Sequence, residues 1–128
     1  MKFGIIGAGM IANFHAEAIK AMAGGELHSF YGRRQDAVAE LVAAHGGKGY
    51  TDLDEFLADP DLDIVTIATP SGAHLEPALA AAKAGKHIIC EKPLEVTPER
   101  IDLMISACED AGVTLSGIFN RRFHPAMD

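Results

Sequence analysis

The chain has 128 residues, the size of about one domain, so it accommodates one compact core and leaves no room for a second. Hydrophobic residues make up 48% of the sequence and charged residues 23%, a mixture typical of globular proteins and unlike disordered chains or membrane spans. The formal net charge of −7 argues against a dedicated nucleic-acid-binding protein, because such proteins bind phosphates mainly through Lys and Arg. We therefore expect neither nucleic acid nor a membrane among its partners.

Short apolar runs alternate with longer segments of helical periodicity along the whole chain. In chain order, we predict a strand at 2–6, a helix at 10–22, a strand at 26–31, a helix at 35–45, a weak strand at 48–50, a helix after Asp52, a strand at 63–68, a helix at 75–84, a strand at 87–91, a helix after Thr97 and a strand at 113–119. The run from Ile64 to Ala68 is apolar on both faces, which indicates a strand covered by helices on both sides. The alternation predicts an α/β fold with a mainly parallel six-strand sheet.

Helix starts and buried faces can be predicted in the same way. Asp52 with Glu55 resembles a capping box, and Thr97 followed by Pro98 is typical of a helix start. In the first helix, the stripe that we expect to face the sheet contains Ile11, His15, Ala18 and Met22.

The cysteines and the start of the chain indicate the compartment. Gly7, Gly9 and Asn13 interrupt the first apolar run, so a secretory signal is not expected. Cys90 lies in a strand-like run and Cys108 in a helix-like run. We expect two buried thiols in a reducing cytoplasm, with a disulfide or a metal site as the alternative. We expect no metal site, because metal-ligand spacing is absent among the interior or surface histidines His15, His28, His45 and His87.

A glycine-rich turn follows the first predicted strand and opens the first predicted helix. Gly7-Ala8-Gly9-Met10-Ile11-Ala12 matches the form G-x-G-x-x-A of the dinucleotide-binding fingerprint in the required strand–turn–helix context. Gly7 would allow the tight turn, Gly9 the close approach of a pyrophosphate, and Ala12 the contact between helix and strand. The amides of Met10 and Ile11 would then face the phosphates at the positive end of the helix. The alternative is a plain glycine turn without a ligand.

The end of the second strand bears on the choice of dinucleotide. An acid that binds the ribose hydroxyls of NAD is expected about 20 residues after the glycines. Gly32 stands there instead, Arg33 and Arg34 follow, and Asp36 lies too far along. Because a guanidinium pairs well with a 2′-phosphate, we favour NADP over NAD as the cofactor. The alternative is that both arginines are solvated charges at a helix start.

Two further loops carry residues that resemble a known family. Ala84 to Pro93, which contains Glu91-Lys92-Pro93, is similar to the signature of the glucose-fructose oxidoreductase, inositol dehydrogenase and rhizopine-catabolism (Gfo/Idh/MocA) family. The resemblance covers essentially the whole chain. It also includes the glycine-rich turn, the Thr69-Pro70 loop with His74, and, after the sixth strand, Arg121-Arg122-Phe123 with Pro125.

The resemblance implies a Rossmann-type doubly wound fold and hydride transfer between a nicotinamide and a carbinol or carbonyl carbon of a sugar, polyol or related small molecule. Lys92 matches the family's catalytic lysine, which contacts the reacting hydroxyl and the nicotinamide ribose. Glu91 matches a residue that supports that ribose and lysine, although plain solvation at a strand end is the alternative. The other expected cofactor-binding positions are Thr69, Pro70, His74 and Pro93, of which His74 also fits a packing role at a helix start.

The basic residues are unevenly placed along the chain. Five of the eleven Lys and Arg residues lie just past the carboxyl end of a predicted strand, namely Arg33, Arg34, Lys92, Arg121 and Arg122. The acids lie mostly on helices or their caps, so we expect an acidic body with a basic rim that attracts an anionic cofactor. Alternatively, the last two arginines pair with acids of a neighbouring domain.

The expected organisation is a dinucleotide-binding domain at residues 1–120, with residues 121–128 starting the connection to an α+β substrate domain that this chain lacks. The resemblance places the family's catalytic histidine in that second domain, and His124 does not match it. We expect the chain, whether truncated, proteolysed or designed, to bind dinucleotide and turn over substrate poorly. The alternatives are a stand-alone binding or interaction module without catalysis and a methyltransferase. A homo-oligomer could form through the surface that the second domain would cover.

Overall fold

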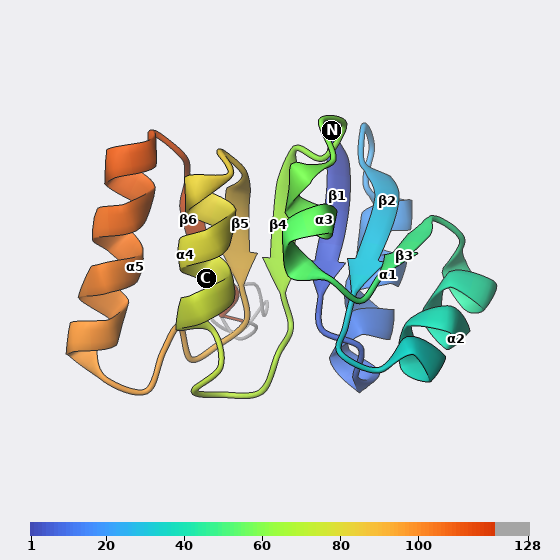
Figure 1. Cartoon of the computed structure of the whole chain (residues 1–128), viewed down its shortest axis with the longest axis horizontal. Coiled ribbons are helices and arrows are strands. Elements are labelled where there is room, and N and C mark those ends of the chain that lie inside the picture. The colour runs from blue at the N-terminus through green and yellow to red at the C-terminus, as the bar shows by residue number, and fades with distance from the viewer. Residues whose placement is uncertain (120–128) are drawn as a thin grey trace, which may run out of the picture.

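The computed structural model of this chain describes residues 1–119, which form a six-stranded sheet with helices on both faces (Figure 1). All strand pairs are parallel, and the order across the sheet is β3-β2-β1-β4-β5-β6. The strands are β1 (Lys2–Ile6), β2 (Glu26–Tyr31), β3 (Lys48–Tyr50), β4 (Ile64–Ile67), β5 (His87–Cys90) and β6 (Leu115–Gly117). This is the doubly wound α/β fold predicted from the alternation of strands and helices.

Two layers of helices cover the sheet. The helices of this part of the chain are α1 (Met10–Ala21), α2 (Gln35–His45), α3 (Leu53–Ala58), α4 (Leu75–Lys83) and α5 (Pro98–Ala111). In Figure 1, α3, α4 and α5 lie in front of the sheet, and α1 and α2 lie behind it. None of them is long and apolar enough to cross a membrane.

The strand order places a topological switch point at the centre of the sheet. β1 pairs with β2 on one side and with β4 on the other, so the connections leave β1 and β4 in opposite directions. In sheets of this kind, ligands bind in the crevice outside the carboxyl ends of the strands at such a point. The turn after β1 and the loop after β4 both begin there.

The predicted boundaries are too long at three strands and two helices. The strands predicted at 63–68, 87–91 and 113–119 are each shorter in the structure, and the helices predicted at 10–22 and 75–84 end one residue earlier. Ala68 and Glu91 still donate a backbone N–H to the neighbouring strand, at 2.8 Å and 3.0 Å. Beyond those bonds the chain leaves the sheet, because these residues begin the loops of the candidate site.

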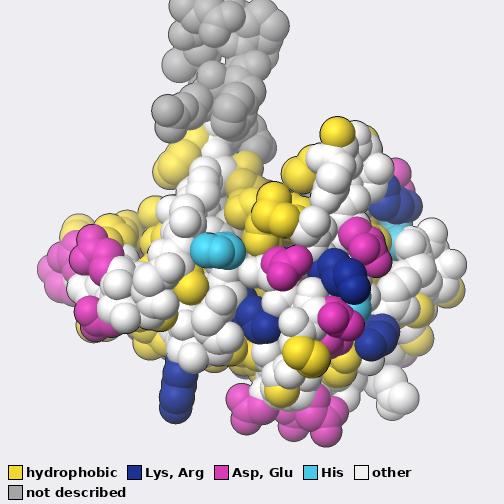
Figure 2. Space-filling model, turned by 90° about the horizontal axis from the view of Figure 1, so that it is seen from above, with side chains coloured by type: hydrophobic (Ala, Val, Ile, Leu, Met, Phe, Trp, Pro, Cys, Tyr) yellow, Lys and Arg dark blue, Asp and Glu magenta, His cyan; other side chains and the backbone are white. Residues whose placement is uncertain are grey.

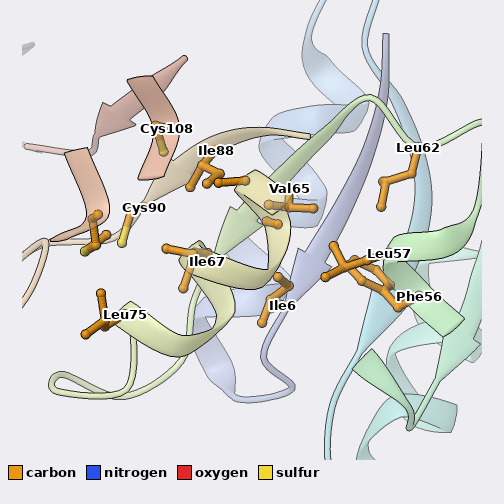
Figure 3. Close-up of a cluster of buried hydrophobic side chains, with 14 residues drawn as sticks. Ile6, Phe56, Leu57, Leu62, Val65, Ile67, Leu75, Ile88, Cys90 and Cys108 are labelled. Atoms are coloured by element: carbon orange, nitrogen blue, oxygen red, sulfur yellow. The ribbon is translucent and has the colours of Figure 1, made fainter. Parts of the chain in front are cut away.

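Each face of the sheet has its own apolar core. On the face of α3, α4 and α5, sheet residues pack against helix residues (Figure 3), and the labelled set is Ile6, Phe56, Leu57, Leu62, Val65, Ile67, Leu75, Ile88, Cys90 and Cys108. On the face of α1 and α2, the buried cluster is Phe3, Ile5, Ala12, Ala16, Ile19, Phe30, Val38, Leu41 and Ile64. All four residues of β4 are buried, which confirms that this strand is covered on both sides.

The stripe predicted to bury α1 is wrong at three of its four positions. Ile11 and Met22 are 42% and 43% exposed, and Ala18 is also exposed. The face that packs on the sheet contains His15 from the predicted stripe together with Ala12, Ala16 and Ile19. The small side chains at positions 12 and 16 let the helix approach the sheet closely, and this close packing decides the rotation of the helix more than the hydrophobicity of Ile11 or Met22 does.

The predicted helix caps are confirmed. The Asp52 carboxylate accepts the Glu55 N–H at 3.0 Å, and the Thr97 hydroxyl accepts the Arg100 N–H at 3.2 Å.

The structure contains a further helix cap, on α4, that the sequence does not predict. The buried Glu95 carboxylate, from the loop after β5, accepts the N–H groups of His74 and Leu75 at 3.1 Å and 2.8 Å and so caps α4. Only the tertiary fold brings residues so far apart in sequence into contact.

Both cysteines are buried and free, as predicted. Burial raises the pKa of Cys90 to about 12, and the nearby charges of Glu91 and Glu95 act in the same direction. The thiols therefore behave as apolar core groups, with Cys90 on β5 and Cys108 on α5.

A buried hydrogen-bond network joins the end of α3 to β2, β3 and the start of β5. The Asp59 carboxylate, just after α3, accepts hydrogen bonds from His28 Nε2 at 2.8 Å and from the Tyr50 hydroxyl at 3.2 Å. The bond from His28 holds the pKa of Asp59 well below its ordinary value, although burial acts in the opposite direction. The Lys86 ammonium, at the start of β5, donates to the Asp59 and Leu62 carbonyl oxygens. The network therefore lies toward the edge at which the strands begin.

We expect Asp59→Asn to lower the free energy of unfolding by about 1–3 kcal/mol near neutral pH, because it leaves buried hydrogen-bonding groups imperfectly paired. Since the folded pKa of Asp59 is lowered, its contribution is fully present above its unfolded pKa of about 4 and is lost as the pH falls toward the folded value. Urea unfolding near neutral pH and at about pH 3 measures this change.

The difference between wild type and Asp59→Asn should shrink at the lower pH. Asp61→Asn is the control, because Asp61 is 61% exposed and its contact with Lys2 is long, at 3.9 Å. A difference of equal size at both pH values would contradict the role of the Asp59 charge.

Candidate functional site

The turn after β1 lies directly against the ends of β2 and β4. Gly7 has a φ of +120°, in the region that favours glycine, and its N–H donates to the Tyr31 carbonyl oxygen at 2.8 Å. A Cβ atom at this position would lie 2.8 Å from the Ala68 carbonyl oxygen. No side chain fits, so Gly7 brings the start of α1 against the ends of β2 and β4, as the sequence predicts for the first glycine of the motif.

The second glycine leaves open space at the start of α1. Gly9 is the N-cap residue, and a Cβ atom built on it would meet nothing within 4 Å. The helix start has no side-chain cap and no acid in its first turn. Ala12 is fully buried against the sheet. The amides of Met10 and Ile11 are therefore available to an anion, and the turn fits the pyrophosphate of a dinucleotide.

A shallow hollow adjoins this turn between α1 and α2. Its volume is about 400 Å³, and its lining residues include Gly9, Met10 and Asn13 from the first helix and Ala37, Glu40 and Leu41 from the second. The carboxylate of Glu40 disfavours a phosphate beside it, so the end of the hollow at Gly9 suits an anion better.

Close packing excludes an acidic side chain at the end of β2. A Cβ atom at Gly32 would lie 2.7 Å from the Ala8 Cβ atom and 3.0 Å from a Val38 methyl group. Gly32 also donates its N–H to the Tyr50 carbonyl oxygen at 3.2 Å. A carboxylate that binds ribose hydroxyls therefore cannot be placed here without moving the phosphate-binding turn.

The two arginines after Gly32 differ in their partners. The Arg34 guanidinium donates two hydrogen bonds to the Asp36 carboxylate, at 2.9 Å and 3.3 Å, and this pair lowers the pKa of Asp36. Arg33 is exposed and forms no ion pair within residues 1–119. Arg33 is thus the freer of the two to bind an added anion.

Hydrogen bonds between residues of the loop after β4 hold its conformation. The Thr69 hydroxyl donates to the Ala73 carbonyl oxygen at 2.9 Å, and the Ala73 N–H donates to the Pro70 carbonyl oxygen at 3.0 Å. His74, which ends the loop, is only 1% exposed. Its ring lies 2.8 Å from the Thr69 carbonyl oxygen and 2.9 Å from that of Pro93. These contacts fit the packing interpretation of His74 better than a direct contact with a cofactor.

Lys92 stands on the loop that follows β5. It is exposed, as is Pro93, and the peptide bond between them is cis. The Glu91 side chain is only 19% exposed, and its Oε1 atom lies 2.8 Å from His15 Nε2. Glu91 is therefore held in a fixed place, and simple solvation at a strand end does not describe it. Lys92 Nζ has no hydrogen-bond or ion-pair partner among residues 1–119.

His15 is the residue of this region whose contacts with the loop after β5 the sequence interpretation missed. The sequence places His15 on the sheet-facing stripe of the first helix, which is confirmed, but it indicates no polar partner for the ring. Its Nδ1 atom lies 2.9 Å from the Thr66 hydroxyl oxygen, opposite the contact with Glu91. No local signal could have identified these partners, because Thr66 and Glu91 are 51 and 76 positions away from His15.

The basic rim is present in part. Arg33, Arg34 and Lys92 follow the carboxyl ends of their strands, while Arg121 and Arg122 lie outside the described residues, as do Phe123, His124, Pro125 and the predicted domain boundary. Figure 2 views the opposite edge, where the strands begin, and there acidic and basic side chains are mixed. Within the described part of the chain, no cluster of His, Cys, Asp or Glu is arranged to hold a metal ion.

Comparison with known proteins identifies the family. The family model described as "Oxidoreductase family, NAD-binding Rossmann fold" (GFO_IDH_MocA) matches residues 1–119. Myo-inositol 2-dehydrogenase of Thermotoga maritima is 38% identical over 124 residues, which are 96% of this chain and 37% of that protein. D-xylose 1-dehydrogenase (NADP(+)) 2 of Haloferax volcanii is 38% identical over 131 residues, covering 100% of this chain and 40% of that protein.

The fold comparison agrees with the sequence comparison. The WlbA dehydrogenase from Bordetella pertussis, solved in complex with NADH and UDP-GlcNAcA, superposes with a TM-score of 0.90 at 33% identity, covering 95% of this chain and 36% of that chain. This chain thus spans well under half the length of these relatives. The match to an oxidoreductase family excludes the alternative that the chain is a methyltransferase. The chain belongs to the Gfo/Idh/MocA oxidoreductase family and matches its NAD-binding Rossmann domain.

Proposed function

We propose that this chain is the cofactor-binding part of an NAD(P)-dependent oxidoreductase that acts on a CH–OH group of a sugar, polyol or related small molecule. The observation that carries the proposal is the hydrogen bond between His15 on α1 and Glu91 after β5. It connects the helix that begins at the phosphate-binding turn with the loop that carries Lys92. An anion-binding turn and a free ammonium group therefore belong to one site at the carboxyl ends of the strands.

Each part of the site has a proposed role toward the dinucleotide. Gly7 and Gly9 shape the turn, and the amides of Met10 and Ile11 bind the pyrophosphate. Gly32, Arg33 and Arg34 lie at the adenosine ribose. The residues proposed to border the nicotinamide half are Thr69, Pro70, Glu91, Lys92 and Pro93. His74 holds the loops after β4 and β5 together beneath them.

Lys92 is the proposed catalytic residue. The bound nicotinamide supplies the carbon that gives or takes the hydride. An exposed ammonium group at this edge stabilises the negative charge that develops on the substrate oxygen, and it influences the pKa of the group that moves the proton. Glu91 keeps the start of the loop in place, so Lys92 is presented from a rigid strand end.

The substrate pocket and the proton-transferring group belong, in this proposal, to a second domain of the whole protein. The relatives support this, since this chain covers only 36–40% of their length. The domain boundary near residue 120, a homo-oligomer and a cytoplasmic location also stay predictions. Two free, buried thiols support the reducing compartment.

NADP is the favoured cofactor. Gly32 has no room for a carboxylate, and a free guanidinium at Arg33 can pair with a 2′-phosphate. The relatives name both cofactors, NADP(+) in the Haloferax volcanii enzyme and NADH in the Bordetella pertussis complex, so the preference rests on these residues of the chain.

Calorimetric titration of the 128-residue chain with NADPH and NADH tests the preference. We expect Arg33→Ala to weaken NADPH binding by about 10- to 100-fold, because a charge-assisted hydrogen bond to the phosphate is lost, and to leave NADH binding nearly unchanged. Arg34→Ala should weaken NADPH binding less, because the Arg34 guanidinium is already paired with the Asp36 carboxylate. Tenfold tighter binding of NADH by the wild type would overturn the preference.

Two glycine variants separate folding from binding at the phosphate turn. Gly7→Ala should lower the free energy of unfolding by at least about 2 kcal/mol, because an alanine must adopt a positive φ and approach a carbonyl oxygen. Gly9→Ala should lower the free energy of unfolding by no more than about 1 kcal/mol, since its φ of −89° is ordinary, its surroundings are open, and alanine is a moderately worse N-cap than glycine. It should weaken dinucleotide binding by about tenfold or more, because the methyl group points into the space for pyrophosphate. Urea unfolding and calorimetry give both numbers, and unchanged affinity in Gly9→Ala would contradict the proposed site.

Catalysis is tested in a protein that carries this chain together with its substrate domain. Lys92→Met should lower kcat by about 100- to 1000-fold on the substrate found in a panel of sugars and polyols, while NADPH affinity stays within a few-fold of wild type. Lys92→Arg is the control that keeps the charge.

The chain alone should bind dinucleotide and show no turnover. Dinucleotide binding without hydride transfer in the longer protein would favour the alternative of a binding module.

A further inference from the structure

We propose that His15 is a positioning residue that joins the phosphate-binding helix to the loop of Lys92, so that the carboxylate of Glu91 and the backbone of Lys92 hold one orientation. The effect of His15 on cofactor binding rests on the proposed function. The effect of His15 on the position of Glu91 does not, because it can be observed in this chain without a cofactor. Within residues 1–119, the hydrogen bonds of the His15 ring go to Thr66 and Glu91, so its action on Lys92 passes through Glu91.

The contacts of His15 span three elements of the fold. Its ring extends from α1, its Nδ1 atom lies 2.9 Å from the Thr66 hydroxyl oxygen on β4, and its Nε2 atom lies 2.8 Å from Glu91 Oε1 after β5. His15 is 8% exposed and Thr66 4%. Since water is excluded from most of this path, each hydrogen bond is costly to leave unmade.

The chemistry of the partners fixes the direction of these bonds. A carboxylate only accepts, so His15 Nε2 carries the hydrogen toward Glu91, whereas the Thr66 hydroxyl both donates and accepts. In neutral His15, Thr66 donates to Nδ1, and the ring is held as the Nε2–H tautomer. The Glu91 carboxylate thus selects the Nε2–H tautomer, and the Thr66 hydroxyl supports the ring from the other side by donating to Nδ1.

The arrangement couples the two ends of the site. His15 lies in the second turn of α1, whose first amides face the expected pyrophosphate, and Glu91 is the residue before Lys92. A helix moves as a rigid body, so a small shift of α1 when an anion binds reaches Glu91 through one hydrogen bond. By the reciprocity of coupled equilibria, an ordered Glu91 favours the same helix position and thus tighter anion binding.

A second buried histidine–carboxylate pair in the same chain supplies a matched control. His28 Nε2 and Asp59 Oδ2 are also 2.8 Å apart, and both side chains are less than 10% exposed. That pair ties β2 to the end of α3, toward the edge at which the strands begin, and among residues 1–119 its side chains form no hydrogen bond with α1 or the loop after β5. If His15 only stabilised the fold, His15 and His28 variants would behave alike.

The first experiment uses the chain without cofactor. Nitrogen NMR of the His15 ring should show the Nε2–H tautomer, and His15→Leu should shift and broaden the Glu91 and Lys92 amide signals. His15→Gln, which keeps an N–H group near the position of Nε2, should restore them. His28→Leu should lower the free energy of unfolding and leave the Glu91 and Lys92 signals in place.

Two variants of Thr66 keep the inference testable if His15→Leu does not fold. Thr66→Val removes the hydroxyl without changing the shape, so the His15 ring loses the hydrogen bond at Nδ1 that holds its orientation and the Lys92 amide signal should move. Thr66→Ser keeps the hydroxyl and should resemble the wild type. Unchanged Glu91 and Lys92 signals in Thr66→Val, or equal shifts in His28→Leu, would overturn the inference.

A second experiment measures NADPH affinity in the folded variants by calorimetry. We expect about tenfold weaker binding for His15→Leu, near-wild-type binding for His15→Gln, and no change for His28→Leu. If the wild type binds no dinucleotide, the proposed function fails, and the NMR comparison still decides the role of His15. If the wild type binds and His15→Leu binds equally well, the coupling is overturned while the proposed function stands.

Discussion

The rest of the site depends on the close approach of backbone at Gly7. This residue adopts a positive φ, donates to the end of β2 and leaves no space for a Cβ atom against the end of β4. That contact sets where α1 begins, and the small buried residues Ala12 and Ala16 then let the helix lie close to the sheet. Only at this distance can the ring of His15 reach both Thr66 and Glu91.

Local charge at the site departs from the net charge of the chain. The formal charge is −7, yet the helix that would face the phosphates has no acid in its first turn, and two basic groups without an ion-pair partner among residues 1–119, Arg33 and Lys92, follow strand ends. The opposite edge of the sheet has acids and bases mixed (Figure 2). Amides at a helix start and a few guanidinium or ammonium groups can therefore bind an anionic cofactor without a basic protein surface.

Buried polar groups hold the loops that the candidate site needs. Glu95 caps α4 from the loop after β5, and its pKa is lowered because hydrogen bonds from Val96, Leu75 and Arg100 outweigh the opposing effect of burial. His74 contacts carbonyl oxygens of the loops after β4 and β5. Each of these groups joins two loops, which makes the carboxyl edge rigid while Lys92 itself stays exposed.

The fold class, most element boundaries, the helix caps at Asp52 and Thr97 and the glycine-rich turn could all be predicted from local sequence patterns, because these features depend on neighbours within a few residues. Tertiary structure alone decided the rotation of α1, the different partners of Arg33 and Arg34, the cap by Glu95 and the pairing of His15 with Glu91. The strand order β3-β2-β1-β4-β5-β6 brings residues 76 positions apart within 2.8 Å, and no local pattern encodes such a contact. Hydrophobicity alone predicted the wrong face of α1, because close packing of small residues against the sheet outweighed burial of the larger side chains of Ile11 and Met22.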